Sequence, residues 1–296
     1  MKRRTDYTEQ ARLELDAYTV MLERIALQYA RRVSQAMLPF AGPLAASAAP
    51  MAADVRLDDV LPLQTVIGKL LLAVGQVILP SASMVGKVVQ AFGRANGRHV
   101  SSLLAQHPDK PKRIATIDLW RSESWLEQAG QVWSTQGAAL ITRISQDMAD
   151  RAANAVLAGV KAGLRHEALA GRIEAAMAVP AWRARLIARD QVSKWNSQLT
   201  ARRFQDSGVQ AFIWRTARDR RVVGRPGGLY PEAKSPDKHG NHYEREGRIF
   251  LLERERGGLV ELVGRGSAQK RIIHADWDDG LPGEPIQCRC WAEPVL

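Results

Sequence analysis

Cysteine is scarce in this chain of 296 residues, and its scarcity excludes a class of protein. The two cysteines, Cys288 and Cys290, are separated by one residue and cannot build the disulfide framework of a small secreted domain. The amino-terminal residues are basic, but no apolar core of a signal peptide follows them. We therefore expect no export signal and a reducing cytoplasm as the environment.

Long hydrophobic runs are also missing. The most hydrophobic stretch is residues 62–92, and its longest charge-free piece, residues 70–86, is interrupted by Pro80 and by serines on its carboxyl side. It is shorter than the roughly 20 apolar residues that an α-helix needs to cross a bilayer. The segment predicts a buried helical hairpin bent at Pro80, and no association with a membrane is expected.

Acidic residues are fewer than basic ones. Asp and Glu number 31 against 42 Lys and Arg, which gives a formal net charge of +11. Such a surface attracts polyanions, since a bound nucleic acid releases its counterions. Charge alone decides partners poorly, so an ordinary basic surface and genuine nucleic-acid contact both remain open.

The pattern of the first two thirds of the chain is helical. Apolar residues recur every three or four positions from Leu15 to Met37, which predicts a long amphipathic helix that packs on its own domain or docks on a partner. Residues 39–53, rich in Ala, Pro, Ser and Gly, predict a linker or a bent connection. Further helices are predicted at residues 61–104, 117–164, 167–177 and 182–205. Gly163 and Gly208 are placed to end two of them.

Short strands are predicted after Gly208. Residues 210–214, 248–252 and 259–263 have strand-like composition and are separated by charged turns that contain glycine. The fold class is therefore α+β, with a mainly helical N-terminal part followed by a small, loop-rich α+β C-terminal module.

Residues of fixed type recur through this C-terminal part. A strand that contains Trp214 runs into an Asp-Arg turn, a histidine stands five residues before a glycine, and Pro282-Gly283 precedes the Cys-Arg-Cys run. In order, the motif positions are Trp214, Asp219, Arg221, His242, Gly247, Phe250, Cys288 and Cys290. This pattern resembles the phage Mu protein F-like family, the minor head or head-morphogenesis proteins of tailed phages.

The resemblance extends upstream through Ile187-Ala-Arg-Asp190, where many members of the family read Ile-Ala-Arg-Thr-Glu. Two departures stand out. The interval from Asp219 to His242 is longer than is usual in the family, and Gln191 stands where an acidic residue is common. The segment that resembles the family begins near residue 140. The division that follows is a helical, partner-binding region at residues 1–135 and a head-morphogenesis domain at residues 136–296.

The resemblance implies a function for the whole chain. It implies a minor capsid protein of a tailed phage or prophage that is associated with the portal and with capsid or scaffold proteins. It also implies contact with packaged double-stranded DNA without sequence preference. The expected location is the interior of the virion, and the host cytoplasm during assembly.

Cys288, Cys290 and His242 form a metal-like set, with His274 or Asp219 as a candidate further member. Zinc takes thiolate and imidazole ligands, and a loop-rich module gains stability from such a clip. Structural zinc sites usually have two residues between paired cysteines, however, so we favour packed thiols and keep zinc as the alternative. No cofactor is otherwise expected. The closure that ends at Cys290 is expected to hold a C-terminal strand against the strand that contains Trp214.

An enzymatic alternative uses Asp219, His242, Glu244 and the cysteine pair. A histidine and carboxylates on a loop can activate water or a metal ion in a nuclease or another hydrolase. The chain shows no nucleophile motif, phosphate-binding loop or zinc-protease helix. We therefore expect a protein that is not an enzyme, and Asp219 with Arg221 is interpreted as a structural pair in a turn.

Arginines are concentrated on either side of Gly208. The candidate phosphate contacts are Arg202, Arg203, Arg218 and Arg221. Guanidinium groups at this density suit the phosphate backbone better than base edges. A solvated helix face explains the same charges equally well, and a stand-alone DNA-binding protein remains a third alternative.

Overall fold

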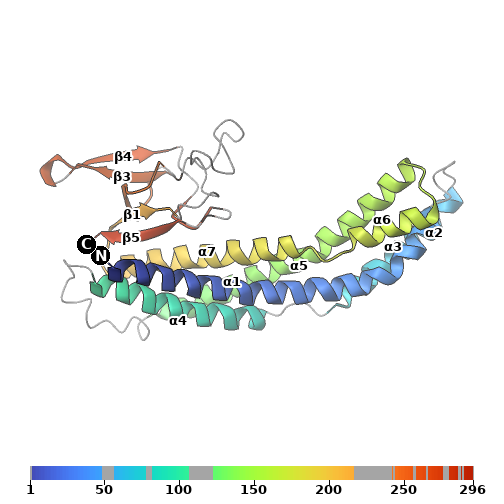
Figure 1. The fold of residues 1–296 in the computed structure, drawn as a ribbon, viewed down its shortest axis with the longest axis horizontal. Helices are drawn as coiled ribbons and strands as arrows, with labels where there is room; N and C mark the ends of the chain where they lie inside the picture. Colours follow the sequence, from blue (N-terminus) through green and yellow to red (C-terminus); the bar gives the residue numbers. More distant parts are fainter. Residues whose placement is uncertain are drawn as a thin grey trace. The chain divides into compact units, whose positions relative to one another are not determined.

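The computed structural model has an α+β fold, as predicted, with helices followed by an antiparallel sheet (Figure 1). It describes residues 2–48, 57–77, 82–106, 123–216, 242, 244–255, 258–264, 266–275, 280–285, 288 and 290–295. Among these residues, none of the helices is both long and apolar enough to cross a membrane.

The helices confirm most of the predicted ones. Their bounds are α1 Lys2–Met37, η1 Leu38–Phe40, α2 Ala41–Ala48, α3 Leu57–Gly75, α4 Ala82–Gln106, α5 Ser124–Lys161, α6 His166–Ala176 and α7 Ala181–Asp206. Gly163 follows α5 with φ +63°, and Gly208 follows α7 with φ +79°. A glycine in this left-handed conformation commonly ends a helix, because a side chain there would be strained.

The linker predicted at residues 39–53 is wrong over its first part. Residues 38–48 form η1 and α2 instead, and Leu44 is buried there together with Ala41, Ala45 and Ala48. Alanine is the best helix former, and Pro43 is tolerated in the first helical turn because its missing N–H has no partner there. The small side chains of α2 allow it to pack against α3 and α6. Residues 49–53 lie outside the described residues.

The apolar stripe of α1 packs inside the protein. Leu22, Tyr29, Val33 and Met37 are at most 3% exposed, and Ile25 is half-buried. Of the two uses predicted for this stripe, the described residues support packing on its own domain, and docking on a partner stays a prediction.

The sheet has five antiparallel strands in the order β4-β3-β2-β1-β5 (Figure 1). The bounds are β1 Ala211–Arg215, β2 Ile249–Leu251, β3 Leu259–Val263, β4 Lys270–His274 and β5 Trp291–Val295. The predicted pairing of a C-terminal strand with the Trp214 strand is confirmed, since Trp214 lies opposite Ala292. Pro294 is compatible with β5 because an edge strand leaves one row of N–H groups without a ladder partner.

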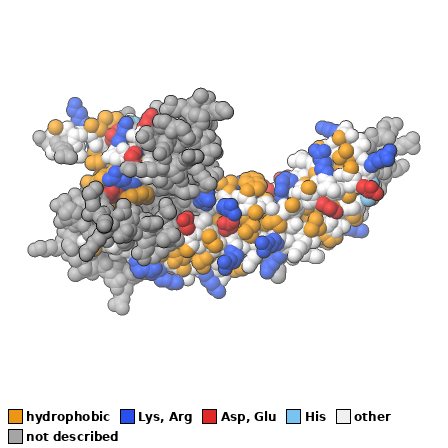
Figure 2. Space-filling model, in the orientation of Figure 1, with side chains coloured by type: hydrophobic (Ala, Val, Ile, Leu, Met, Phe, Trp, Pro, Cys, Tyr) orange, Lys and Arg blue, Asp and Glu red, His pale blue; other side chains and the backbone are white. Residues whose placement is uncertain are grey.

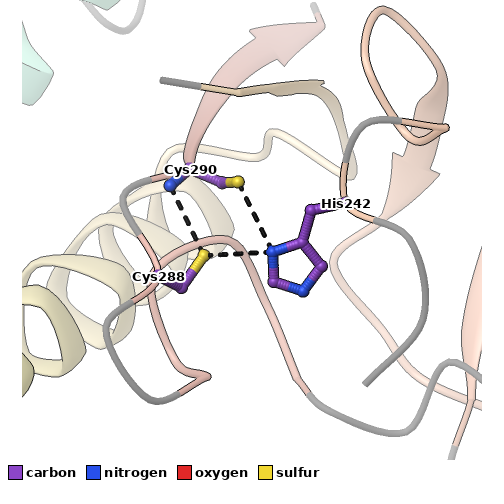
Figure 3. Close-up of side chains that lie close together, drawn as sticks. All are labelled: His242, Cys288 and Cys290. Carbon is purple, nitrogen blue, oxygen red and sulfur yellow. Dashed lines mark hydrogen bonds between the residues drawn. The ribbon is translucent and has the colours of Figure 1, made fainter. Parts of the chain in front are cut away.

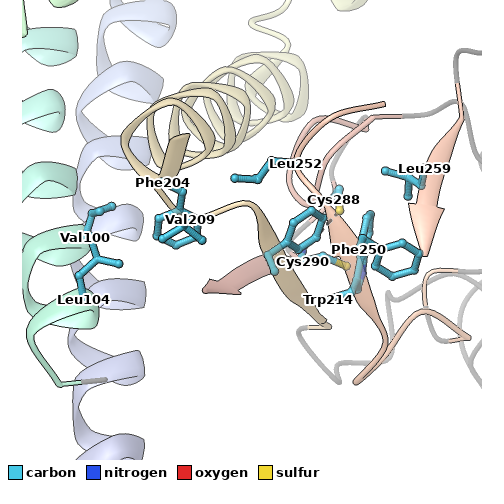
Figure 4. Packing of buried hydrophobic residues seen from close by; sticks show 11 residues of the cluster. Val100, Leu104, Phe204, Val209, Trp214, Phe250, Leu252, Leu259, Cys288 and Cys290 are labelled. Carbon is cyan, nitrogen blue, oxygen red and sulfur yellow. Dashed lines mark hydrogen bonds between the residues drawn. The ribbon is translucent and has the colours of Figure 1, made fainter. Parts of the chain in front are cut away.

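A hydrophobic core joins the sheet to the helices around it (Figure 4). Val100 and Leu104 of α4 lie near Phe204 at the end of α7 and near Val209. The core continues through Phe212, Trp214, Phe250, Leu252, Leu259, Cys288 and Cys290. The rings of Trp214 and Phe250 meet edge to face, with centroids 6.0 Å apart. Both thiols therefore belong to the core on which the sheet is built.

The chain forms two compact units. The sheet unit contains residues 1–19, 88–130 and 189–296, and the helical unit contains residues 20–87 and 131–188. Helices α1, α4, α5 and α7 contribute residues to both. The division predicted between residues 135 and 136 falls inside α5 and stays a prediction.

Candidate metal centre

Three motif residues meet in the core of the sheet unit (Figure 3). The imidazole Nδ1 of His242 lies 3.5 Å from the Sγ of Cys288 and 3.7 Å from the Sγ of Cys290. Each of the three residues is 6% exposed. Their candidate ligand atoms all lie within 4.8 Å of one another. The sequence prediction that these residues form one set is thus matched by their positions in the fold.

A turn attached to β1 holds His242. The backbone N–H of Arg245 donates to the His242 carbonyl, and the N–H of Gly247 donates to the Trp214 carbonyl. Trp214 in turn donates its own N–H to the carbonyl of Arg248 at 2.9 Å. Gly247 has φ +77°, which explains why the motif has a glycine at this position. The Trp214 and His242 rings then meet edge to face, with centroids 5.4 Å apart.

A second loop, held by Gly283, positions the two thiols. Gly283 has φ +95°, and a Cβ there would lie 3.1 Å from the Ser193 carbonyl oxygen on α7. Only glycine therefore allows this close approach without strain. The backbone N–H groups of Gly283 and Cys290 both donate to the Sγ of Cys288, each at 3.4 Å.

The pKa values of the two thiols are shifted in opposite directions. Burial by itself raises the pKa of Cys288. Hydrogen bonds from Cys290 and His242, with the charge of His242, outweigh burial and hold the pKa of Cys288 well below its usual range. The pKa of Cys290 is raised well above its usual range, chiefly by its hydrogen bond to Cys288 and then by burial.

Arg245 lies buried beside the cluster and was not among the site residues predicted from the sequence. It is fully buried, and its guanidinium lies over the Trp214 ring, 4.7 Å from the centroid. Its positive charge opposes the rise in the pKa of Cys290. Only its place in the chain, three residues after a motif histidine, could have marked it.

The remaining motif residues are placed as follows. Trp214 and Phe250 are fully buried and pack against each other beside the cluster. Asp219 and Arg221 lie outside the described residues.

His274, another candidate for the metal set, does not join it, because its Nε2 lies 2.7 Å from a carboxylate oxygen of Glu261. Glu244 is exposed whereas His242 is buried.

The prediction that Arg203 contacts nucleic acid is wrong. Its side chain is 1% exposed and forms a bidentate pair with Glu123, with N–O distances of 2.6 and 2.7 Å. A further guanidinium N–H donates to Asn96 at 2.6 Å. With its donors committed to buried partners, Arg203 cannot reach a phosphate.

Other predicted basic contacts differ from Arg203. Arg202, its neighbour on α7, has a side chain that is 54% exposed, paired with Asp206 and placed over the Trp125 ring. Arg218 and Arg221 lie outside the described residues. On the face shown in Figure 2, Lys and Arg side chains are scattered among other types and do not gather into one patch. Arg202 therefore remains a candidate phosphate contact.

Other basic side chains of α7 form ion pairs with acidic residues. Arg183 pairs with Asp147 at 3.0 Å, and Lys194 pairs with Asp190 at 2.8 Å. Pairing of this kind is what the solvated-helix interpretation expects.

Comparison with known proteins identifies one distant similarity. An uncharacterised protein of Haemophilus influenzae is 27% identical over 157 residues, which cover 53% of this chain and 27% of that protein. The chain thus spans little more than a quarter of that relative's length. No family model matches the chain. No solved structure matches it either.

Proposed function

We propose that this chain is a minor head protein of a tailed phage or prophage, and that its role is structural. The observation that supports the proposal best is the convergence of the described motif positions. Trp214, His242, Phe250, Cys288 and Cys290 come from four separate stretches of the chain and meet in one core. Motif residues that serve packing are expected of a module whose task is assembly.

The proposed partners are the portal and the capsid or scaffold proteins. The helical unit offers an apolar surface for them on α3, where Ile67, Leu71 and Leu72 are 38%, 53% and 66% exposed. Large apolar side chains that are exposed together on one helix mark a protein-binding surface. We assign this α3 surface, rather than the buried stripe of α1, to partner binding.

Contact with packaged DNA is the other part of the proposal. It is supported by the net charge of +11 and by exposed Arg202. The hydrolase alternative has less support among the described residues, because Asp219 lies outside them and Glu244 is exposed. A stand-alone DNA-binding protein lacks a reason to expose the α3 surface.

The test is binding to the portal protein encoded by the same phage. The purified chain is expected to co-elute with the portal oligomer on size-exclusion chromatography. Replacing Ile67, Leu71 and Leu72 with Ser should weaken binding at least tenfold, since about 1.4 kcal/mol corresponds to a factor of ten. Replacing exposed Gln64 and Lys69 of the same helix with Ser is the matched control and should leave binding unchanged. A chain that binds neither portal nor capsid nor scaffold protein contradicts the proposal.

A further inference from the structure

We propose that Cys288, Cys290 and His242 bind one Zn²⁺ ion that stabilises the sheet unit. This inference concerns the metal content of the chain and does not rest on the proposed role in the phage head. It reverses the preference for packed thiols that the Cys-x-Cys spacing favours in the sequence.

Distances within the cluster match a zinc site. Zinc bonds to sulfur at about 2.3 Å and to nitrogen at about 2.0–2.1 Å, with tetrahedral angles. These values require a nitrogen–sulfur separation of about 3.6 Å between two ligands of one ion. The observed separations are 3.5 Å to Cys288 and 3.7 Å to Cys290. Both nitrogen–sulfur separations therefore suit ligands of one ion, and the three atoms lie within 4.8 Å of one another.

Hydrogen bonding alone explains the cluster less well. An imidazole Nδ1 has either one N–H or one lone pair, so it can form a good hydrogen bond with only one of the two sulfurs at a time. Yet Nδ1 lies at nearly equal distances from both, as Figure 3 shows. A metal ion between the three atoms would accept the Nδ1 lone pair and both thiolates together.

The surroundings are those of a metal thiolate. Sulfur ligands need donors that support their negative charge, and such outer partners orient the ligands as well. Cys288 accepts the backbone N–H groups of Gly283 and Cys290. The buried guanidinium of Arg245 lies beside the cluster on Trp214. Packed neutral thiols would need none of these groups.

The one-residue spacing of the cysteines does not prevent chelation here. Side chains two residues apart on an extended chain point to the same side, and Cys290 directly precedes β5. His242 enters from the turn that is held to the end of β1. An ion at this place ties together chain segments that are 46 and 48 residues apart. Such a link stabilises a unit with many loops and a small sheet.

Metal content of the full-length chain is the direct measurement. Protein purified under reducing conditions without added chelator should contain about one equivalent of zinc. Exchange for Co²⁺ should produce the charge-transfer absorption of cobalt thiolates. X-ray absorption at the zinc edge should show two sulfur neighbours at about 2.3 Å and at least one lighter neighbour at about 2.0–2.1 Å.

Variants then assign the ligands. Cys288→Ser, Cys290→Ser and His242→Gln should each lose at least half of the bound metal and the cobalt absorption. His166→Gln, which changes an exposed histidine on α6, is the control and should keep both. A chelator should lower the melting temperature of the parent chain and leave that of the Cys288→Ser variant unchanged. Acidification should release the metal, because protons compete for thiolate and imidazole.

Measurements on the parent chain alone can contradict the proposed zinc site. The test therefore does not depend on whether the variants fold. Folded protein with less than about a tenth of an equivalent of zinc, no uptake of Co²⁺ and two free thiols would establish packed cysteines. A mass deficit of two hydrogens under non-reducing conditions, persisting in the presence of zinc, would establish a disulfide and equally overturn the proposal. Neither result would affect binding to the portal, and failure to bind the portal would not affect the metal content.

Discussion

Single glycines decide where the candidate ligands lie. Gly247 shapes the turn that carries His242, and Gly283 brings the loop before the cysteines against α7. Both glycines were recognisable in the sequence as motif residues, but the backbone conformations that require glycine there were not. Gly247 needs a left-handed backbone with open space around it, whereas Gly283 needs that backbone and a close approach to the Ser193 carbonyl.

Alanine substitutions separate these two requirements. Gly247→Ala should lower the free energy of unfolding by about 1 kcal/mol, which is the cost of a left-handed backbone for alanine. Gly283→Ala should cost more, about 2–3 kcal/mol, because its Cβ would also press on a helix carbonyl that cannot shift freely. Chemical denaturation monitored by tryptophan fluorescence measures both. Equal losses for the two variants would mean that the approach to α7 has no energetic importance.

The members of the candidate site were predictable from the sequence, but their arrangement was not. His242, Cys288 and Cys290 were recognisable because their residue types and positions form a motif. The direction of Nδ1 and the two N–H donors to Cys288 depend on how two distant loops fold against β1, which no local pattern contains. Arg202 and Arg203 are adjacent and chemically identical, so their opposite burial was likewise beyond the sequence.

Three elements of the sheet unit are joined by a buried polar network. Arg203 of α7 pairs with Glu123, which directly precedes α5, and donates to Asn96 of α4. The side-chain amide of Asn96 in turn donates hydrogen bonds to Asn196 and Thr200 of α7, each at 2.9 Å. Every link joins segments that are distant in the chain, so the network sets how these helices meet.

Removing one charge from this network should be costly. Glu123→Gln should lower the free energy of unfolding by about 3–5 kcal/mol, because it leaves the Arg203 charge buried without compensation. The double variant Glu123→Leu, Arg203→Met should recover much of that loss, since it removes both charges. Arg202→Gln, which breaks the exposed pair with Asp206, is the matched control and should cost less than about 1 kcal/mol. Similar losses for Glu123→Gln and Arg202→Gln would contradict the assigned role of the network.

Elements were predictable where the local sequence was distinctive. The apolar repeat of α1 and the strand-like composition of β1 and β3 identified these elements directly. Helix α2 was mistaken for a linker because its Gly and Pro content concealed an alanine helix. Strand β4 was missed because its first four residues are exposed, so no apolar face appears in its sequence.

For the molecule as a whole, net charge alone does not decide between nucleic-acid contact and an ordinary basic surface. The net charge is +11, and in the described part of the chain several basic side chains pair with acidic ones. The helices and sheet instead offer an apolar surface on α3 and a core built from motif residues. The proposed role in the head therefore depends on assembly contacts more than on net charge.

The protein content of purified heads tests this role most directly. Heads and head precursors made by the phage or prophage that encodes the chain should contain it in a fixed ratio to the portal protein, measured by quantitative mass spectrometry. Loss of the chain should reduce the yield of DNA-filled heads. A chain that is abundant in the lysate, absent from heads and precursors alike, and dispensable for their formation would not be a head protein.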